Sequence, residues 1–498
     1  MVPIYSRPPT CRGVAHAHRR TTPTSAAAPP KSHFLSVIAA SSLVIFIGFG
    51  CGVSPDVDNE HVRESGESGT YVGPPAAGTY PADQEDVQRW IDTTDTSRIR
   101  QHAWDIWASI TSPSGISDLP VWETWYSGHE IFDLAVTTVE KEPGILRDFE
   151  IPAQSTHTAS KVDIPVDLPE RVVSFNRYTR TLADYIVTEG YNRKATLAEL
   201  NKKFDKAKTP TVDRKLLTSA GPVDASQIVL KPVFQFISGS EPTVVPFWRG
   251  VAPAYTTDLD NPVPKTWRQG VVVDPSGGLT PGAIVRMAVN GDEKDLRVVG
   301  LDEFYYIRLT QDDAEAFEAS SFGFGSGDDV GTDNETTKKA LIAVVKAGNI
   351  ALLVAMHVTT KEIPNWTWQT FWWAFDNQEP PFGGDRPLTV QGAWANYNMR
   401  AAYYMVTPPG KVGGDPLISF NPYLETNLTG TVPGPVIDGK HTQIHWTGVH
   451  TNCMSCHRMA GYQTQGYQPD GFISPADETF FASGTKTDFL WSIPLRAK

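Results

Sequence analysis

NIALLVAMHVTTKEIPNWTWQTFWWAFDN, residues 349–377, is the stretch that best indicates how this chain folds. Its first twelve residues form an apolar and β-branched run, which is typical of a buried strand. Met356 and His357 then project to opposite faces of a sheet, because successive side chains of a strand alternate. After Pro364, apolar and polar residues alternate over 366–370, which favours a second strand. The tryptophans of this second run are predicted to pack in the core.

Short strands also precede this stretch, so we predict a large β-rich domain over residues 216–434. The candidate strands are QIVLKPVFQFI (227–237), TVVPFW (243–248), GVVVD (270–274), AIVRMAV (283–289) and FYYIRLT (304–310). A helix over 311–319, capped by Thr310, is expected to interrupt them, and a solvated Gly/Asp loop follows at 322–334. The stretch AWANYNMRAAYYMV, residues 393–406, is compatible with a further helix.

Helical patterns dominate residues 86–215, which we predict to be a mainly helical region. Three helices are expected here: 96–110 behind a cap at Asp95 or Thr96, 174–189, and one opened by a capping box at Thr196–Glu199. His102 is expected to be an ordinary residue of the first helix, and residues 119–132 an aromatic packing loop. The chain is therefore predicted to be α+β, with N-terminal helical segments, a β-rich centre and a short C-terminal segment, 435–498.

The C-terminal segment contains the most specific motif of the chain, Cys453-Met-Ser-Cys456-His457. Two of the four cysteines in 498 residues have the C-x-x-C spacing, and a histidine follows directly. Thiols one helical turn apart can each form a thioether bond to a haem vinyl group, while the histidine binds the iron. The motif resembles the haem-attachment site of c-type cytochromes. This resemblance implies one covalent haem c, held by Cys453 and Cys456, with His457 as an iron ligand.

Two other interpretations of the motif remain open. A zinc site needs two further ligands, but the remaining cysteines, Cys11 and Cys51, lie in the N-terminal region. A thioredoxin-like redox pair would begin a helix after a βαβ pattern, which the sequence lacks. Haem attachment is therefore favoured.

Residues 1–50 have the features of an export signal. They contain five basic and no acidic residues, and they end in the apolar run FLSVIAASSLVIFIGFG, residues 34–50. The junction at Cys51 resembles a bacterial lipobox, which implies lipidation of Cys51, although Gly48 departs from the preferred leucine. An uncleaved membrane anchor and ordinary cleavage are the alternatives. All three alternatives place the body of the protein in the periplasm or another extracytoplasmic space. Lipidation and an uncleaved anchor would also tether it to the membrane.

A flexible tether is predicted at residues 51–85, which are rich in Gly, Pro and acidic side chains and lack apolar periodicity. Removal of residues 1–50 would change the formal net charge from −13 to −18. Such an acidic chain argues against nucleic-acid binding and suits docking to a basic redox partner. The sequence does not identify that partner.

The second axial ligand of the iron is the main open question. Only 41 residues follow His457, and the one methionine among them, Met459, is too close in sequence to reach the opposite side of a haem. The upstream candidates are Met356, His357, Met399, Met405, His441, His445 and His450. An unusual donor such as Lys or Tyr, and an open position, remain possible. The Trp-x-Trp-x-Thr-Phe run at 366–371 is similar to segments of uncharacterised bacterial cytochrome-like proteins, and its tryptophans are candidates for a haem wall.

Three functions follow from these features. A haem iron with two protein ligands transfers single electrons, so the favoured function is a membrane-tethered, extracytoplasmic monohaem cytochrome. An open iron position would permit a haem-dependent oxidoreductase of peroxidase or oxidase type, or a redox subunit whose β-rich domain binds a substrate. In a third interpretation the β-rich domain binds a partner and the haem is structural. No Ser/His/Asp set, Walker loop or H-E-x-x-H motif gives the β-rich domain a chemistry of its own.

Overall fold

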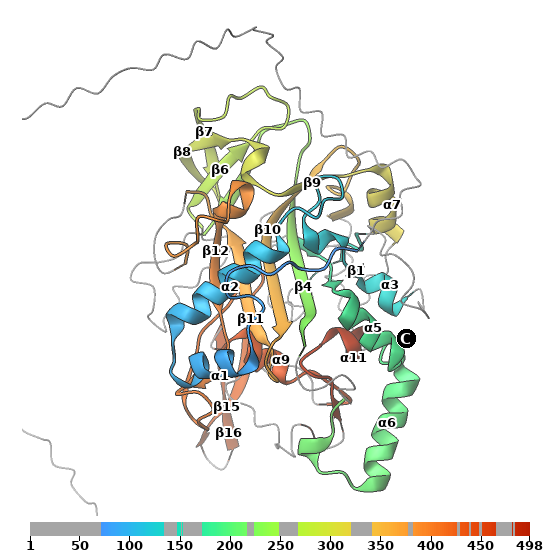
Figure 1. Ribbon diagram of the computed structural model, residues 1–498. Coiled ribbons are helices and arrows are strands. Elements are labelled where there is room, and N and C mark those ends of the chain that lie inside the picture. The colour runs from blue at the N-terminus through green and yellow to red at the C-terminus, as the bar shows by residue number, and fades with distance from the viewer. Residues whose placement is uncertain are drawn as a thin grey trace, which may run out of the picture. The chain divides into compact units, whose positions relative to one another are not determined.

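The computed structural model describes residues 71–133, 147–150, 152, 172–216, 224–248, 267–319, 341–376, 382–425, 429–437, 440–447, 451–464, 481 and 484–498 (Figure 1). For 429–437 and 440–447 the description covers the backbone alone. All described residues belong to one compact unit. The predicted export signal, Cys51 and the loop at 322–334 lie outside the described residues.

An antiparallel sheet of eight strands forms the centre of the fold. Its strands run in the order β1-β3-β4-β10-β11-β12, with β2 beside β4 and β9 beside β10. The strands are β1 (Tyr126–Ser127), β2 (Val172–Ser174), β3 (Arg177–Tyr178), β4 (Asp224–Ile237), β9 (Tyr306–Arg308), β10 (Ile350–Lys361), β11 (Thr367–Trp373) and β12 (Tyr397–Ala401). Strands from the segment predicted as mainly helical therefore pair with strands of the segment predicted as β-rich.

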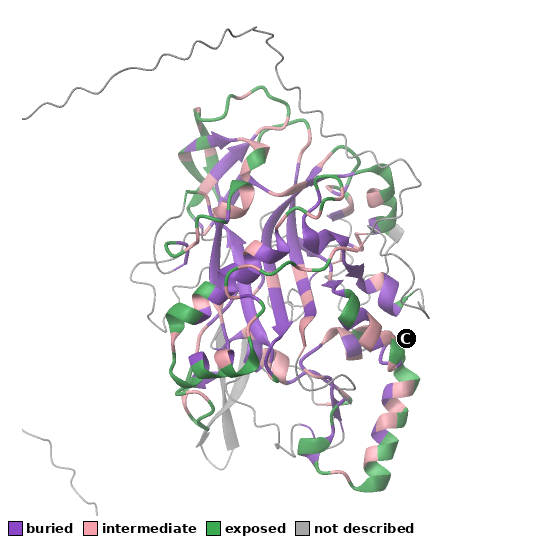
Figure 2. Cartoon of the chain, in the orientation of Figure 1, coloured by how far each residue is buried: buried purple, intermediate pink, exposed green. Residues whose placement is uncertain are grey.

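Strands β10 and β11 confirm the two strands predicted from residues 349–377. Every residue of β11 is buried, and every residue of β10 except His357 is buried, as Figure 2 shows for the centre of the sheet. Burial on both faces explains the continuous apolar run of β10, because neither face of the strand meets water. The tryptophans Trp366, Trp372 and Trp373 are fully buried, as expected for core residues.

The two faces of the sheet carry different side chains. Met356, Phe371 and Met399 are in register across β10, β11 and β12, and helix α2 (Thr96–Ile110) covers this row. The ring of Trp107 on α2 stacks on Phe371 with 4.2 Å between ring centroids. We call this side the α2 face (Figure 1).

The neighbouring row points to the other side because side chains alternate along each strand. It consists of Lys231, His357, Thr370 and Arg400, again in register across four strands. Trp368 lies two residues before Thr370 and belongs to the same side. Helix α9 contacts β11 here, so we call this side the α9 face.

The remaining helices surround this sheet. They are α1 (Gln84–Asp92), η1 (Val121–Thr124), α3 (Gly128–Phe132), α5 (Arg180–Thr188), α6 (Lys194–Ala207), η3 (Thr211–Asp213), η5 (Leu301–Glu303), α7 (Gln311–Ala319), η6 (Gly392–Asn396), α9 (Cys453–Arg458) and α11 (Ser492–Arg496). The predicted helix at 96–110 is confirmed with Asp95 as its cap, and so is the helix at 311–319. None of the helices in the described part of the chain has the length and apolar character needed to cross a membrane.

Three predicted helices differ from the structure. The helix expected at 174–189 begins only at Arg180, because residues 172–174 and 177–178 pair with β4. Helix α6 begins at Lys194, so Thr196 lies inside the helix and forms no capping box. The helix expected at 393–406 is wrong: η6 and β12 occupy this stretch, and pairing of β12 with β11 outweighs its helical spacing.

The predicted tether is also too long. From Tyr71 onward the chain packs against the body, and Tyr80 is only 3% exposed. Asp105 of α2 accepts hydrogen bonds from the backbone nitrogen and hydroxyl of Thr79, at 2.7 and 2.8 Å. The aromatic and apolar residues of this segment therefore belong to the core, which composition alone did not indicate.

Smaller sheets complete the fold. A four-stranded sheet has the order β5-β6-β8-β7, in which β6 and β8 are parallel. Its strands are β5 (Thr243–Phe247), β6 (Gln269–Val273), β7 (Ile284–Val289) and β8 (Asp292–Val299). Three strand pairs follow: β13 (Val406–Thr407) with β14 (Asp415–Pro416), β15 (Thr429–Ile437) with β16 (Lys440–Thr447), and β17 (Gly461–Tyr462) with β18 (Thr485–Lys486). Helices and sheets are both well represented, which confirms a mixed α+β chain.

Candidate functional site

Helix α9 brings the three motif residues together on one side. Cys453, Cys456 and His457 are partly exposed, while Met454 and Ser455 between them are buried. Residues three and four apart share a helix face, which explains this division. Both cysteines are thiols and not a disulfide.

The buried side chain of Asn452 fixes the start of α9. Its Oδ1 accepts a hydrogen bond from the backbone nitrogen of Ser455 at 3.0 Å and so caps the helix. Its Nδ2 donates to the carbonyl oxygens of Met405 at 3.0 Å and Leu417 at 2.7 Å. One amide therefore joins the motif helix to two distant segments. We did not identify Asn452 from the sequence, although asparagine directly before a short helix is a common cap signal.

The orientation of His457 is set by its ring nitrogen Nδ1. This atom lies 2.8 Å from the carbonyl oxygen of Phe489. A carbonyl oxygen only accepts, so Nδ1 carries the proton and Nε2 keeps its lone pair. The pKa of His457 is lowered to about 4, mainly by burial, and the charges of His357 and Lys231 contribute in the same direction. At neutral pH His457 is thus an uncharged imidazole with Nε2 available as a ligand, the arrangement usual for a metal-binding histidine.

The backbone that accepts this hydrogen bond has an unusual conformation. Asp488 and Phe489 have φ angles of 50° and 69°, in the left-handed region that non-glycine residues rarely adopt. Lys361, at the end of β10, holds this segment through contacts of 2.8 and 2.7 Å from Nζ to the two carboxylate oxygens of Asp488. Left-handed residues persist where surrounding contacts hold them, often at functional sites. The Lys361–Asp488 pair thus positions the Phe489 carbonyl for His457.

Trp368 supplies an aromatic surface beside His457. The two ring centroids are 4.3 Å apart, with an angle of 41° between the planes. The indole nitrogen of Trp368 donates to the carbonyl oxygen of Asn365 at 3.0 Å, which fixes the ring. Arg458 donates to the Asn365 side chain at 3.1 Å, so α9 is tied to the same loop. Trp368 is thus the clustered tryptophan whose ring contacts His457.

The thiol of Cys453 is not activated. Burial raises its pKa well above the ordinary value, and the charge of Glu425 raises it further. Cysteines of thiol–disulfide enzymes have lowered pKa values, because the thiolate is the reactive form. The environment of Cys453 therefore differs from that of a redox-active pair. In the part of the chain that the structure describes, no group of three or more His, Cys, Asp or Glu forms a metal-binding cluster.

Three ionisable side chains face α9, and we call them the polar wall: Lys231, His357 and Glu425. The charges of all three act on the pKa of His457: those of His357 and Lys231 lower it, and that of Glu425 raises it. Lys231 and His357 are cross-strand neighbours on the α9 face. Burial lowers the pKa of Lys231 to about 8.

The third member of the polar wall, Glu425, is held by a turn. The amide of Asn421 donates to the Thr370 hydroxyl at 2.8 Å and to the carbonyl oxygen of Phe371 at 2.9 Å. The backbone nitrogen of Glu425 in turn donates to the carbonyl oxygen of Asn421 at 3.0 Å. Glu425 is thereby fixed above the α9 face. No local sequence pattern indicates Lys231 or Glu425, since each joins the site only through the fold.

The candidate second ligands are widely separated. Met356 and Met399 lie on the α2 face, on the opposite side of the sheet from α9. His357 lies on the α9 face. The backbone of His441 and His445 is in β16, while their side chains, and all of His450, lie outside the described residues.

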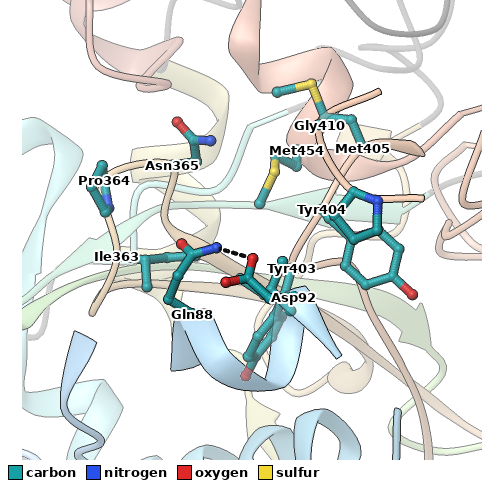
Figure 3. A pocket seen from close by; sticks show the side chains of 12 residues that line it. Gln88, Asp92, Ile363, Pro364, Asn365, Tyr403, Tyr404, Met405, Gly410 and Met454 are labelled. Carbon is teal, nitrogen blue, oxygen red and sulfur yellow. Dashed lines mark hydrogen bonds between the residues drawn. The ribbon is translucent and has the colours of Figure 1, made fainter. Parts of the chain in front are cut away.

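The remaining candidate, Met405, lines a cavity beside α9. This cavity has a volume of about 300 Å³ and lies between α1, the loop after β10 and the segment around Met405 (Figure 3). Gln88 and Asp92 of α1 and Met454 of α9 also line it. Since Met454 is on the buried flank of α9, the cavity is not on the side that presents the three motif residues.

Comparisons with known proteins give no relative for this chain: no family model, curated protein or solved structure matches it.

Proposed function

We propose that this chain is a monohaem c-type cytochrome that transfers electrons outside the cytoplasmic membrane. Cys453 and Cys456 would hold the haem through thioether bonds, and His457 would be the proximal ligand. The observation that carries the proposal is the shared face of α9, where both thiols lie beside an imidazole whose Nε2 is unprotonated. When bound, the haem iron supplies a one-electron couple between its ferric and ferrous states.

The surrounding residues suit a large, flat, apolar group. Asn452 fixes the helix that carries the attachment points, and Phe489 fixes the tautomer of His457. Trp368 lies against the imidazole and is itself only 4% exposed, so it would keep water from the proximal side. Such burial and hydrogen bonding are the means by which a protein sets the reduction potential of a haem.

The predicted location agrees with this chemistry. Thioether attachment of haem takes place outside the cytoplasm, and the basic and apolar segment of residues 1–50 is suited to export. Lipidation at Cys51 would keep the protein at the membrane, and the acidic chain would favour a redox partner with a basic surface.

A second function is supported by the polar wall. If the iron kept an open position, His357, Lys231 and Glu425 would lie near it as proton donors and acceptors. Haem-dependent oxidoreductases need such groups to protonate and cleave a bound substrate. This function and electron transfer differ in whether a protein side chain occupies the sixth position of the iron.

Haem attachment can be tested directly. The full chain would be expressed in a host that attaches haem c, and haem staining after denaturing electrophoresis would report covalent attachment. We expect staining of the natural chain, loss of staining in Cys453→Ala/Cys456→Ala, and normal staining in the control Met454→Leu, which changes a buried residue between the two cysteines. Absence of covalent haem in the natural chain, after maturation in a competent host, would contradict the proposal.

Membrane attachment has a separate test. Replacement of Cys51 by Ser should move a lipoprotein from the membrane fraction to the soluble fraction. Unchanged fractionation would favour an uncleaved anchor.

A further inference from the structure

His357 differs from every other residue of its strand. It is the one residue of β10 that is not buried, and its side chain retains 18% of its accessible surface. An imidazole in the middle of a central strand is costly to desolvate unless its nitrogens have partners. A function that requires the imidazole would explain its presence here.

The ring nitrogen Nε2 of His357 has no hydrogen-bond partner. The nearest charged atom, Oε1 of Glu425, is only 2.7 Å away. The distance alone would define an ion pair, but the oxygen lies outside the angular range of a hydrogen bond. The angle is decisive, because the lone pair of an imidazole nitrogen points in one direction in the ring plane. Glu425 is therefore beside Nε2 without forming a hydrogen bond to it.

The position of His357 is suited to a ligand that faces His457. His357 is on the α9 face, diagonal to Trp368, whose ring packs against His457. Trp368 therefore connects the two imidazoles on this face, although 100 residues separate them in sequence. Glu425, 2.7 Å from His357, lies on the same side of the sheet.

The methionine candidates are less suitable. Met356 and Met399 are fully buried on the α2 face. They could reach the α9 face only if the register of their strands shifted by one residue. Met405 lines the cavity on the buried flank of α9, away from the face with the two thiols. Among the candidate side chains that the structure describes, His357 alone combines the right face with an uncommitted ligand atom.

We propose that His357 is the sixth ligand of the haem iron, on the side opposite His457. This inference rests on the proposed function, because it presupposes haem at Cys453 and Cys456. It makes the iron six-coordinate through two imidazoles. Electron transfer then becomes the activity of the site, and direct binding of a substrate to the iron is excluded.

Optical and electron paramagnetic resonance spectra of the full-length holoprotein test this proposal. The natural chain should be low-spin in both oxidation states and should bind carbon monoxide slowly or not at all. In His357→Ala the ferric haem should become high-spin, carbon monoxide should bind at least tenfold faster, and added imidazole should restore the low-spin spectrum. The matched control Met405→Leu should retain the low-spin spectrum of the natural chain.

A second variant covers the case in which the alanine variant does not fold. His357→Met keeps a side chain of similar size that can still bind iron, so the spectrum should stay low-spin while the midpoint potential rises. A high-spin natural chain, an unchanged spectrum in His357→Ala, or a change of spin state in Met405→Leu would each overturn the assignment of His357. These results leave the proposed attachment intact, since haem staining measures it independently. A natural chain without covalent haem would instead overturn the proposed function, and this inference with it.

Discussion

Each side of the central sheet has a histidine next to a glutamate, and the two pairs are built differently. On the α2 face, His102 lies 2.7 Å from the Tyr403 hydroxyl and 3.1 Å from Glu362, so both ring nitrogens have partners. His357, on the α9 face, lies beside Glu425 but has an Nε2 without a hydrogen bond. The first pair is completed within the protein, which is the usual condition of a structural polar group in a core.

The surroundings of the two pairs differ in the same way. The α2 face packs Trp107, Phe371 and Met356 closely, with rings and apolar chains in contact. On the α9 face lie a lysine with a lowered pKa, an imidazole nitrogen without a partner and two residues with left-handed backbone. Proteins tolerate such unfavourable features mainly where function requires them. We therefore expect substitutions on the α2 face to change stability and those on the α9 face to change haem properties.

The largest effect on stability should come from Trp107→Ala. The indole is fully buried and stacks on Phe371 at 4.2 Å, so its loss leaves a cavity that costs about 3–5 kcal/mol of the free energy of unfolding. Denaturant titration would measure this, with the haem spectrum unchanged in the folded protein. Leu388→Ala, at a site 92% exposed, is the control and should stay within about 0.5 kcal/mol of the natural chain. A loss below about 1 kcal/mol for Trp107→Ala would show that the α2 face is not the main source of stability.

The two histidines give the sharpest contrast. His102→Ala would remove partners from Glu362 and Tyr403 in a buried site, and we expect a loss of about 1–3 kcal/mol with no change of spin state. In the haem-free chain, His357→Ala should cost less than about 1 kcal/mol of the free energy of unfolding, because its Nε2 makes no hydrogen bond there. Parallel denaturation and spectra of both variants would measure this difference. The contrast fails if the two variants lose equal stability.

Lys231→Met should stabilise the chain. The pKa of Lys231 is about 8 in the folded protein against 10.5 as its ordinary value, so below pH 8 the folded state holds a charge that burial disfavours. Between pH 8 and 10.5 the unfolded chain binds more protons at this residue, and the free energy of unfolding should rise with pH. We expect Lys231→Met to add about 1–2 kcal/mol to the free energy of unfolding at pH 7, after allowance for solvent screening. The variant should not show the rise of this free energy between pH 8 and 10.5. Denaturant titrations at pH 7 and 9.5 would measure both effects, and a destabilised variant at pH 7 would contradict this account.

The smallest effect is expected from Glu425→Gln. A carboxylate near the proposed haem would stabilise the more positive ferric state, so its neutralisation should raise the midpoint potential. For a partly exposed charge we expect a rise of about 10–40 mV, the one-electron equivalent of 0.2–1 kcal/mol. Redox titration would measure this shift. A fall in potential, or a change of spin state, would show that Glu425 has a different role.

Local sequence patterns predicted the elements whose stability is local. Strand β10 follows from its apolar run, α2 from its spacing and its Asp95 cap, and the motif on α9 from three residues in five. The β12 strand at 397–401 was missed because its pairing with β11 outweighs its own propensity.

The surroundings of the motif could not be predicted in the same way. The alternation of side chains along a strand puts Met356 and His357 on opposite faces of the sheet. It does not say which of the two faces receives α9. Phe489, Glu425 and Lys231 reach the site through contacts between residues 32 or more positions apart. Contacts over such sequence separations depend on the whole fold, so they cannot be predicted from a short stretch of sequence.

The amide of Asn452 also has a consequence for the order of assembly. Its partners at Met405 and Leu417 precede it by 47 and 35 residues, and the strands under α9 come earlier still. Contacts over such separations form late, because the intervening chain must first be ordered. If the chain is exported from its N-terminus, as proposed, the sheet can begin to fold before the motif emerges, and the two cysteines would remain accessible until Asn452 docks. The interval between emergence and docking is the period in which a haem-attaching enzyme would meet an open motif, so the rate of docking would limit the yield of mature protein.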